Sequence, residues 1–263
     1  MTPAREVATE GIVLLGDGAV AGGPAFDAAL GLVLLRRGMG GAREVIRVFN
    51  PAPTAGFSRR DQLRPGFEAA VREVRERGFE PVLRSPGGRF AVYHRGSVVI
   101  DHVCLEPGSA EGMQGRFERY AEMHASILRG LGLDARIGEV PGEYCPGKFS
   151  VSAGGKTKIV GSAQRLTREG WLFSTVIQVS GAAVLREALV TASAALGYDL
   201  DPGTVGAVED TVPNVTTGQV TRAVTDAYAA FADELWPGLP GEVVRALAEA
   251  VRERADEMPD DAG

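Results

Sequence analysis

The sequence predicts an α+β fold in which a mixed, largely antiparallel central sheet is flanked by helices. Expected strands cluster in the middle of the chain, and residues 149–179 predict three strands joined by hairpin-length turns. Segments with helical periodicity lie on either side of this cluster instead of alternating with the strands, which argues against a doubly wound α/β sheet. No internal repeat and no second domain is evident, so we expect a single domain over residues 1–263.

The first half of the chain opens with a helix. Apolar residues recur at helical spacing over 23–37, and a glycine-rich turn follows at 38–41. Within that pattern, Asp27 is either a first-turn acid favoured by the helix dipole or a site residue. A second amphipathic helix, 65–77, ends at Gly78. The other elements expected here are strands at 45–49, 81–84, 90–93 and 98–105 and a helix at 116–131.

The second half begins with a loop rich in Gly and Pro, 141–146, followed by the three-stranded meander. A loop with little periodicity, 201–216, separates the later helices, and we expect 236–263 to combine a C-terminal helix with a frayed acidic tail. The elements expected here are strands at 149–153, 158–166 and 172–179 and helices at 182–196, 217–235 and 241–257.

Composition limits the classes of function. The chain has 263 residues, 44% of them apolar and 24% charged, which is typical of a globular protein. A net charge of −6 argues against nucleic acid as a partner, although an acidic protein partner is possible if arginines gather locally. Two cysteines, no signal peptide and no long apolar run predict a reducing, cytoplasmic setting without a membrane span. The arginines considered for such a patch are Arg36, Arg37, Arg59 and Arg60.

Three separate segments carry candidate chemistry. In the first, Gly87 and Gly88 let the backbone approach a ligand, and Arg84 can pair with a phosphate or carboxylate, although most such glycine pairs are simple turns. In the second, Cys145 lies in a loop and is a candidate nucleophile. Its counterpart, Cys104, lies in an apolar run and is expected to be buried and inert.

The third segment opens with Lys158. A lysine at this position is usually a solvated strand end. Here the strand continues with small residues, which leave room above the sheet for a ligand chain and for a half-buried ammonium group. The small residues are Gly161, Ser162 and Ala163.

Taken together, these segments resemble the biotin/lipoate ligase and octanoyltransferase superfamily over residues 27–178. The similar motifs are Asp27-Ala28-Ala29-Leu30, Thr54-Ala55-Gly56-Phe57, the run from Arg84 through Gly87-Gly88 to Ala91-Val92-Tyr93-His94, and Lys158-Ile159-Val160-Gly161-Ser162-Ala163-Gln164. The third motif has one residue more than the family pattern between its glycines and Ala-Val, and the fourth lacks a glycine before its lysines. The fourth is the most specific because it fixes the lysine relative to the small-residue strand.

The resemblance implies where a substrate lies. The Gly87-Gly88 loop and the Lys158 strand would wall a tunnel for an acyl chain, and Lys158 would contact the acyl carbonyl. His94 falls on the family's pocket histidine, with an ordinary core or surface histidine as the alternative.

Two features indicate a branch of the superfamily. The ligases that activate lipoate with ATP carry an acid and an amide after the histidine, where this chain has Arg95-Gly96-Ser97. They also carry Asn-Asp before the lysine strand. The Tyr144-Cys145-Pro146-Gly147 loop instead resembles the cysteine-dependent octanoyltransferases, most closely the amidotransferases that move an acyl group between lipoyl domains.

The resulting hypothesis is an acyltransferase that moves an octanoyl or lipoyl group onto the lysine of a lipoyl carrier domain. Cys145 would form a thioester, while Lys158 either stabilises its thiolate as an ammonium or accepts its proton when neutral. Backbone N–H groups over 161–163 would hold the oxyanion. Expected partners are a glycine-cleavage H-type protein or a dehydrogenase E2 lipoyl domain, with acyl carrier protein as a further candidate.

This hypothesis requires no cofactor and no metal. Two alternatives remain at this stage. One is an ATP- and Mg-dependent lipoate–protein or biotin–protein ligase, in which Cys145 would have no role. The other, from a different class, is a non-catalytic protein that binds lipoate or a carrier domain.

Overall fold

The computed structural model describes residues 11–15, 22–37, 41–108, 110–236, 238–239 and 241–255. Over these residues an eight-stranded sheet has the order β11-β1-β2-β6-β10-β9-β8-β7, and a smaller sheet has the order β4-β3-β5. In the large sheet β1 pairs in parallel with β2 and β11, and every other pairing is antiparallel. The predicted α+β class with a mostly antiparallel sheet is therefore confirmed, and the small sheet is an addition to it.

The elements follow in chain order. The strands are β1 (Ile12–Leu15), β2 (Glu44–Phe49), β3 (Thr54–Phe57), β4 (Glu80–Leu83), β5 (Ala91–Tyr93), β6 (Ser97–Cys104), β7 (Ala135–Ile137), β8 (Val151–Ala153), β9 (Thr157–Leu166), β10 (Trp171–Gln178) and β11 (Glu234–Trp236). The α-helices are α1 (Pro24–Arg37), α2 (Arg59–Gln62), α3 (Phe67–Glu76), α4 (Met113–Gly130), α5 (Ala182–Leu196), α6 (Thr217–Ala229) and α7 (Gly241–Ala255). None of the helices within the described ranges combines the length and apolarity needed to cross a membrane.

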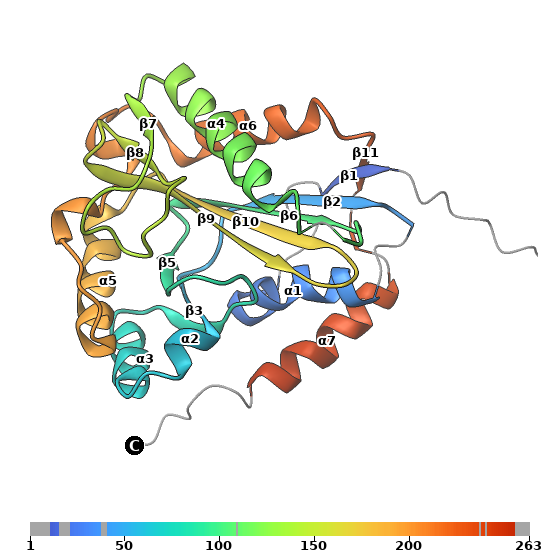
Figure 1. Cartoon of the computed structure of the whole chain (residues 1–263), viewed down its shortest axis with the longest axis horizontal. Helices are drawn as coiled ribbons and strands as arrows, with labels where there is room; N and C mark the ends of the chain where they lie inside the picture. Colours follow the sequence, from blue (N-terminus) through green and yellow to red (C-terminus); the bar gives the residue numbers. More distant parts are fainter. Residues whose placement is uncertain are drawn as a thin grey trace, which may run out of the picture.

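The large sheet separates two sides of the molecule (Figure 1). Helices α4 and α6 cover one face, where their apolar residues form a core with alternate residues of β6 and β10. Helix α1 covers part of the other face and packs against α7. The small sheet lies on that same side with α3 and α5, which share a separate core with it.

Strand β6 shows how the sequence assigns side chains to the two faces. Successive side chains of a strand point to opposite faces. Val98, Ile100 and Cys104 accordingly enter the core under α4 and α6. Val99 and Asp101 point to the α1 side, where both line a cavity.

Several predicted elements differ from the structure. The strands predicted at 90–93 and 98–105 belong to different sheets, because β5 pairs with β3 and β6 lies in the large sheet. The helix predicted to reach 235 ends at Ala229 instead. Beyond it the chain becomes β11, anchored where the Asp233 carboxylate accepts a hydrogen bond from the Ile12 N–H at 2.8 Å.

Other elements were not predicted. Strands β1, β3 and β7 are too short to give a periodic pattern in the sequence. The helix predicted over 65–77 begins at Phe67, and a short helix, α2, precedes it. Most of the turn predicted at 38–41, the side chain of Arg37 and the tail after Ala255 lie outside the described residues.

Candidate active site

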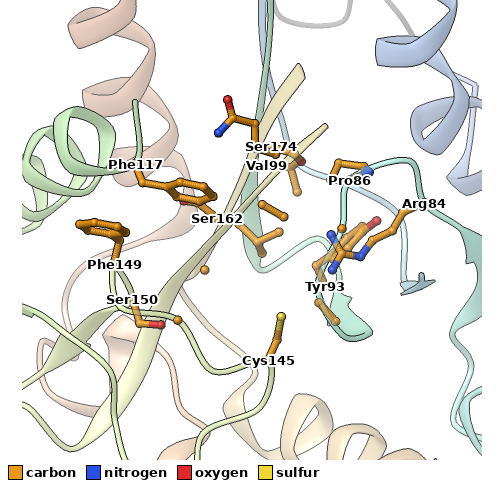
Figure 2. A pocket seen from close by; sticks show the side chains of 18 of the residues that line it. Arg84, Pro86, Tyr93, Val99, Phe117, Cys145, Phe149, Ser150, Ser162 and Ser174 are labelled. Atoms are coloured by element: carbon orange, nitrogen blue, oxygen red, sulfur yellow. The ribbon is translucent and has the colours of Figure 1, made fainter. Parts of the chain in front are cut away.

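A cavity of about 500 Å³ lies on the α1 side of the large sheet, bounded by β9, β10, β6 and the loops after β4 and before β8 (Figure 2). The structure brings together eight of the nine residues singled out in the sequence. The predicted residues that line it are Arg84, Gly87, Gly88, Cys145, Lys158, Gly161, Ser162 and Ala163.

Cys145 lies in a strained loop at the wall of this cavity. Its φ of 43° makes it the one non-glycine residue of the described chain in the left-handed region. A residue before a proline normally adopts an extended conformation, so Pro146 makes this geometry more costly. Strain of this kind persists only where the surrounding structure imposes it, and it is typical of functional sites. The Cys145 Sγ accepts a hydrogen bond from the Arg89 backbone N–H at 3.2 Å, so a thiolate here would face a donor.

The glycine pair approaches the thiol closely. Gly88 has a φ of 94°, and a Cβ atom at this position would lie 2.9 Å from the Cys145 Sγ. Only glycine fits such a position without displacing the thiol. Gly87 differs, because a Cβ atom there would have nothing within 4 Å. The Gly87 N–H is 3.4 Å from the backbone oxygen of Gln164, which joins the loop to β9.

Lys158 is buried, with 2% of its surface exposed. Its Nζ donates to the backbone oxygens of Tyr144 at 3.0 Å and Cys145 at 2.8 Å. A Cβ atom on Gly161 would lie 3.1 Å from the Lys158 Cε, so the missing side chain leaves room for the lysine. The lysine therefore holds the cysteine loop through its backbone, and its hydrogen bond to Cys145 goes to the carbonyl oxygen.

Glu143 completes this arrangement, and sequence reasoning missed it. Its side chain is buried, and Oε1 accepts hydrogen bonds from the Gly147 N–H and the Ser150 hydroxyl, both at 2.9 Å. Its Oε2 lies 3.4 Å from the Lys158 Nζ. Burial lowers the pKa of Lys158, and the charge of Glu143 opposes that shift. An acid two residues before the candidate nucleophile was the available signal.

Arg84 spans the opposite wall. Its Nη2 donates to the Arg89 backbone oxygen at 2.6 Å. Among the described residues its buried Nε has no hydrogen-bond partner, which leaves a donor available at the cavity wall. Gly56 permits this packing, because a Cβ atom there would lie 3.0 Å from the Arg84 Cδ and 3.1 Å from the Tyr93 hydroxyl.

The floor of the cavity is the surface of the large sheet. Gly161 and Ala163 leave the space above β9 open. The Ser162 hydroxyl lies 2.9 Å from the Thr175 hydroxyl, and the register aligns this pair with Ile100 on the opposite face of the sheet. Phe117 and Phe149 stack at 5.8 Å between ring centroids along one side of the cavity (Figure 2). These aromatic rings and small residues give the cavity apolar surface of the kind that an acyl chain requires.

His94 is the predicted site residue that does not line the cavity. Its Nδ1 accepts a hydrogen bond from the Gly96 N–H at 2.9 Å. Its ring lies so close to Gly181 that a Cβ atom there would be 2.6 Å from it. Burial lowers the pKa of this imidazole. A role for His94 in substrate binding stays a prediction.

Comparison with known proteins defines the class. The family described as the lipoyl protein ligase A/B catalytic domain matches residues 24–229, and the chain belongs to this family. Every residue that lines the cavity falls within that range. A solved lipoate-protein ligase A bound with ATP shares the fold, with a TM-score of 0.73 and 20% identity over 93% of this chain and 95% of the other.

Two relatives are more specific. An octanoyl-GcvH:protein N-octanoyltransferase of Geobacillus kaustophilus is 28% identical over 198 residues, covering 73% of this chain and 69% of the relative. A lipoyl-GcvH:protein N-lipoyltransferase of Listeria monocytogenes is 24% identical over 210 residues, covering 73% and 74%. The family and these relatives support the octanoyltransferase branch and an acyltransferase, as the sequence indicated.

Proposed function

We propose that this chain transfers an octanoyl or lipoyl group to the lysine of a lipoyl carrier domain through a thioester on Cys145. The observation that carries the mechanism is the position of Sγ: it lines an acyl-sized cavity, lies in a strained loop and accepts a hydrogen bond from a backbone N–H at 3.2 Å. Backbone strain is typical of functional sites, and a backbone N–H that points at sulfur stabilises a thiolate. Both features favour a reactive thiol over an inert core thiol.

The proposed reaction has two displacements. The Cys145 thiolate attacks the carbonyl carbon of the donor's acyl-lysine amide, the C–N bond breaks, and the departing amine takes up the proton that the thiol released. The neutral ε-amine of the target lysine then attacks the thioester, the C–S bond breaks, and the proton that the amine loses returns to sulfur to restore the thiol. One amide is broken and one is formed, so the transfer itself consumes no nucleotide.

Lys158 and Glu143 are proposed to position the nucleophile. The ammonium group binds the carbonyl oxygens of Tyr144 and Cys145, which maintains the loop in the conformation that aims Sγ into the cavity. The carboxylate of Glu143 supports the same loop through the Gly147 N–H and compensates the buried charge. Removal of either group leaves the other buried without its partner.

Arg84 and the Arg89 backbone N–H are proposed to stabilise negative charge. The N–H contacts Sγ, and the Arg84 Nε is a buried donor without a partner among the described residues. An oxyanion formed next to Sγ can accept a hydrogen bond from such a donor. We prefer these groups to the N–H groups over 161–163 as oxyanion donors, because the Arg89 N–H contacts Sγ directly.

The names of the relatives favour a GcvH-type carrier as the acyl donor. A dehydrogenase E2 lipoyl domain is the proposed acceptor. Acyl carrier protein has no support in these names, and it serves as the comparison donor in the test. The cytoplasmic location and the single-domain organisation stay predictions from the sequence.

The test is a mass measurement. The protein is incubated with an octanoylated GcvH-type carrier, and its intact mass is recorded before an acceptor is added. We expect a gain of one octanoyl group in the native protein and in Cys104→Ala, and none in Cys145→Ala. Labelling that persists in Cys145→Ala would disprove the thioester.

The same assay separates the alternatives. Acyl transfer from free octanoate that requires ATP and releases pyrophosphate would indicate a ligase. Binding of the octanoylated carrier with no labelling and no transfer to any lipoyl domain would indicate a non-catalytic binder.

A further inference from the structure

The cavity floor carries a row of polar residues that the proposed transfer does not use. The sheet register aligns Arg47 of β2 with Asp101 of β6, and Asp101 with Ser174 of β10. Asp101 and Ser174 line the cavity, as does Asp27 of the overlying helix α1. An acyl tunnel built only for hydrocarbon would have apolar residues at these positions.

The position of this row relative to Cys145 matters. The neighbouring row on the same face, Val99, Val176 and Gly161, lies beside the lysine that holds the cysteine loop. Successive same-face residues on a strand are about 7 Å apart, so Asp101 and Ser174 lie one step further into the cavity. An extended eight-carbon chain on Sγ is longer than that step. A chain that runs along the floor past the first row therefore presents its distal carbons to the polar row.

The charged residues at this end of the cavity differ in their partners. Arg47 forms an ion pair with Asp27 at 2.7 Å, with 7% and 12% of the two side chains exposed. Asp101 is hydrogen-bonded to the Ser174 hydroxyl. A carboxylate has about four acceptor sites, so Asp101 retains capacity to accept from a ligand.

A bare octanoyl chain is a poor match for this surface. Its methylene groups displace water from the Asp101 carboxylate and offer no hydrogen bond in return. A reduced lipoyl chain carries thiol groups on its sixth and eighth carbons. An S–H group there can donate to the carboxylate, and sulfur remains compatible with the apolar part of the floor.

From this fit, and on the basis of the proposed function, we propose that Asp101 and Ser174 select an acyl chain with a hydrogen-bond donor at its distal carbons, the dithiol form of the lipoyl group in preference to octanoyl. Asp101 is then a specificity-determining residue. The row would act on the distal end of the chain and not on the reacting carbonyl.

The experiment compares matched donors on one GcvH-type carrier: octanoyl, lipoyl as the disulfide, and lipoyl reduced to the dithiol. We expect the native protein to favour the dithiol over octanoyl by about tenfold in kcat/KM, the size of one hydrogen bond to a charged group. Asp101→Leu should bring that ratio to one or below, because it raises turnover of octanoyl and lowers turnover of the dithiol. Asp101→Asn, of the same size and still polar, should retain part of the preference.

Asp134→Asn is the control, since Asp134 is exposed on a surface turn away from the cavity and should leave the ratio as in the native protein. A native protein that favours octanoyl, or an Asp101→Leu variant with the native ratio, would overturn the proposal. Calorimetric binding of free octanoate and dihydrolipoate gives a second measurement. If no donor supports transfer, the proposed function fails, and the relative binding of the two free acids still decides the role of Asp101.

The pH dependence adds a further check. Burial raises the pKa of Asp101 to about 6, and the charges that face it are Arg47, which opposes the shift, and Asp27, which adds to it. Tyr93 also lies near this carboxylate, and burial keeps its phenol neutral. Preference for the dithiol should therefore fall as pH decreases through about 6, where Asp101 becomes neutral. A preference independent of pH over this range would contradict a contact with the ionised carboxylate.

Discussion

The chain contains two cysteines, and each has an acidic and a basic side chain near it. One thiol is in a setting that favours reaction and the other is in a setting that suppresses it. Cys145 has Glu143 and Lys158 near it, and Cys104 has Glu44 and His102. The Cys145 Sγ contacts an N–H donor in a strained loop at a cavity. The Cys104 thiol lies in β6, 2% exposed and next to the Glu44 carboxylate, which with burial raises its pKa to about 12.

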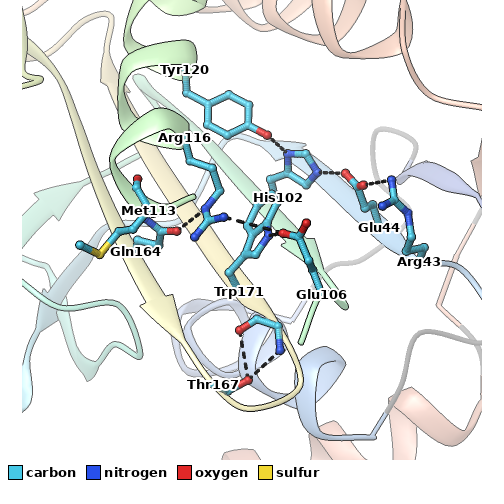
Figure 3. Close-up of polar contacts among 11 residues, drawn as sticks. Arg43, Glu44, His102, Glu106, Met113, Arg116, Tyr120, Gln164, Thr167 and Trp171 are labelled. Atoms are coloured by element: carbon cyan, nitrogen blue, oxygen red, sulfur yellow. Dashed lines mark hydrogen bonds and ion pairs between the residues drawn. The ribbon is translucent and has the colours of Figure 1, made fainter. Parts of the chain in front are cut away.

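The polar residues near Cys104, here called the Cys104 side, form a hydrogen-bonded network among themselves (Figure 3). His102 Nε2 lies 2.8 Å from the Glu44 carboxylate, and its Nδ1 lies 2.8 Å from the Tyr120 hydroxyl. Arg43 in turn donates to Glu44. Each of these groups has its partner within the protein. Burial of ionisable groups therefore does not by itself mark a site; a strained backbone and an available donor distinguish the Cys145 side.

The largest expected difference between the two thiols is in alkylation. With a pKa of about 12, only about one Cys104 in 10⁴ is a thiolate at pH 8. We expect iodoacetamide to label Cys145 at least about 10³ times faster than Cys104, as measured by peptide mass spectrometry. Activity should be lost in step with labelling of Cys145. Equal labelling rates of Cys145 and Cys104 in the folded protein would contradict the predicted difference in reactivity between the two thiols.

Breaking the Lys158–Glu143 pair should cost stability. Lys158→Met leaves a buried carboxylate without its cation, and we expect unfolding free energy to fall by about 3–5 kcal/mol, measured by denaturant titration. Lys158→Met combined with Glu143→Gln should recover part of that loss and none of the activity. Full stability in the single variant would show that the pair does not hold the loop.

The glycine pair offers a matched comparison. Gly88→Ala places a Cβ atom 2.9 Å from the Cys145 Sγ at a φ of 94°. We expect kcat/KM to fall about 100-fold, the effect of displacing a reacting group. Gly87→Ala, which meets nothing within 4 Å, should cost about threefold or less. Similar losses in the two variants would mean that the loop responds to any added side chain.

The smallest effect on activity is expected on the Cys104 side. Tyr120→Phe removes the hydroxyl next to His102 and should lower the free energy of unfolding by about 1–2 kcal/mol. Because this network does not line the cavity, kcat/KM should change less than about twofold. A large loss of activity with native stability would connect the network to catalysis.

Much of the site was accessible from the sequence because it lies in contiguous motifs. Position 161 is a glycine because the Lys158 side chain lies over it. These two residues are three positions apart, so their relation can be recognised in the sequence. The helix 182–196 and the three-strand meander were predicted for the same reason, since their signals are periodic and local. His94 shows the limit, because a motif match did not place its side chain in the cavity.

The sequence by itself determined the α+β class, the candidate cysteine and lysine, and the family that their motifs resemble. Those features depend on residue type and spacing along the chain. Tertiary structure decided which donor faces Sγ, that Glu143 lies beside Lys158, and that Asp101 meets Ser174 on the cavity floor. Each of these contacts joins residues from separate elements, and their register is set by the pairing of the strands and the packing of loops against them, which no local pattern records.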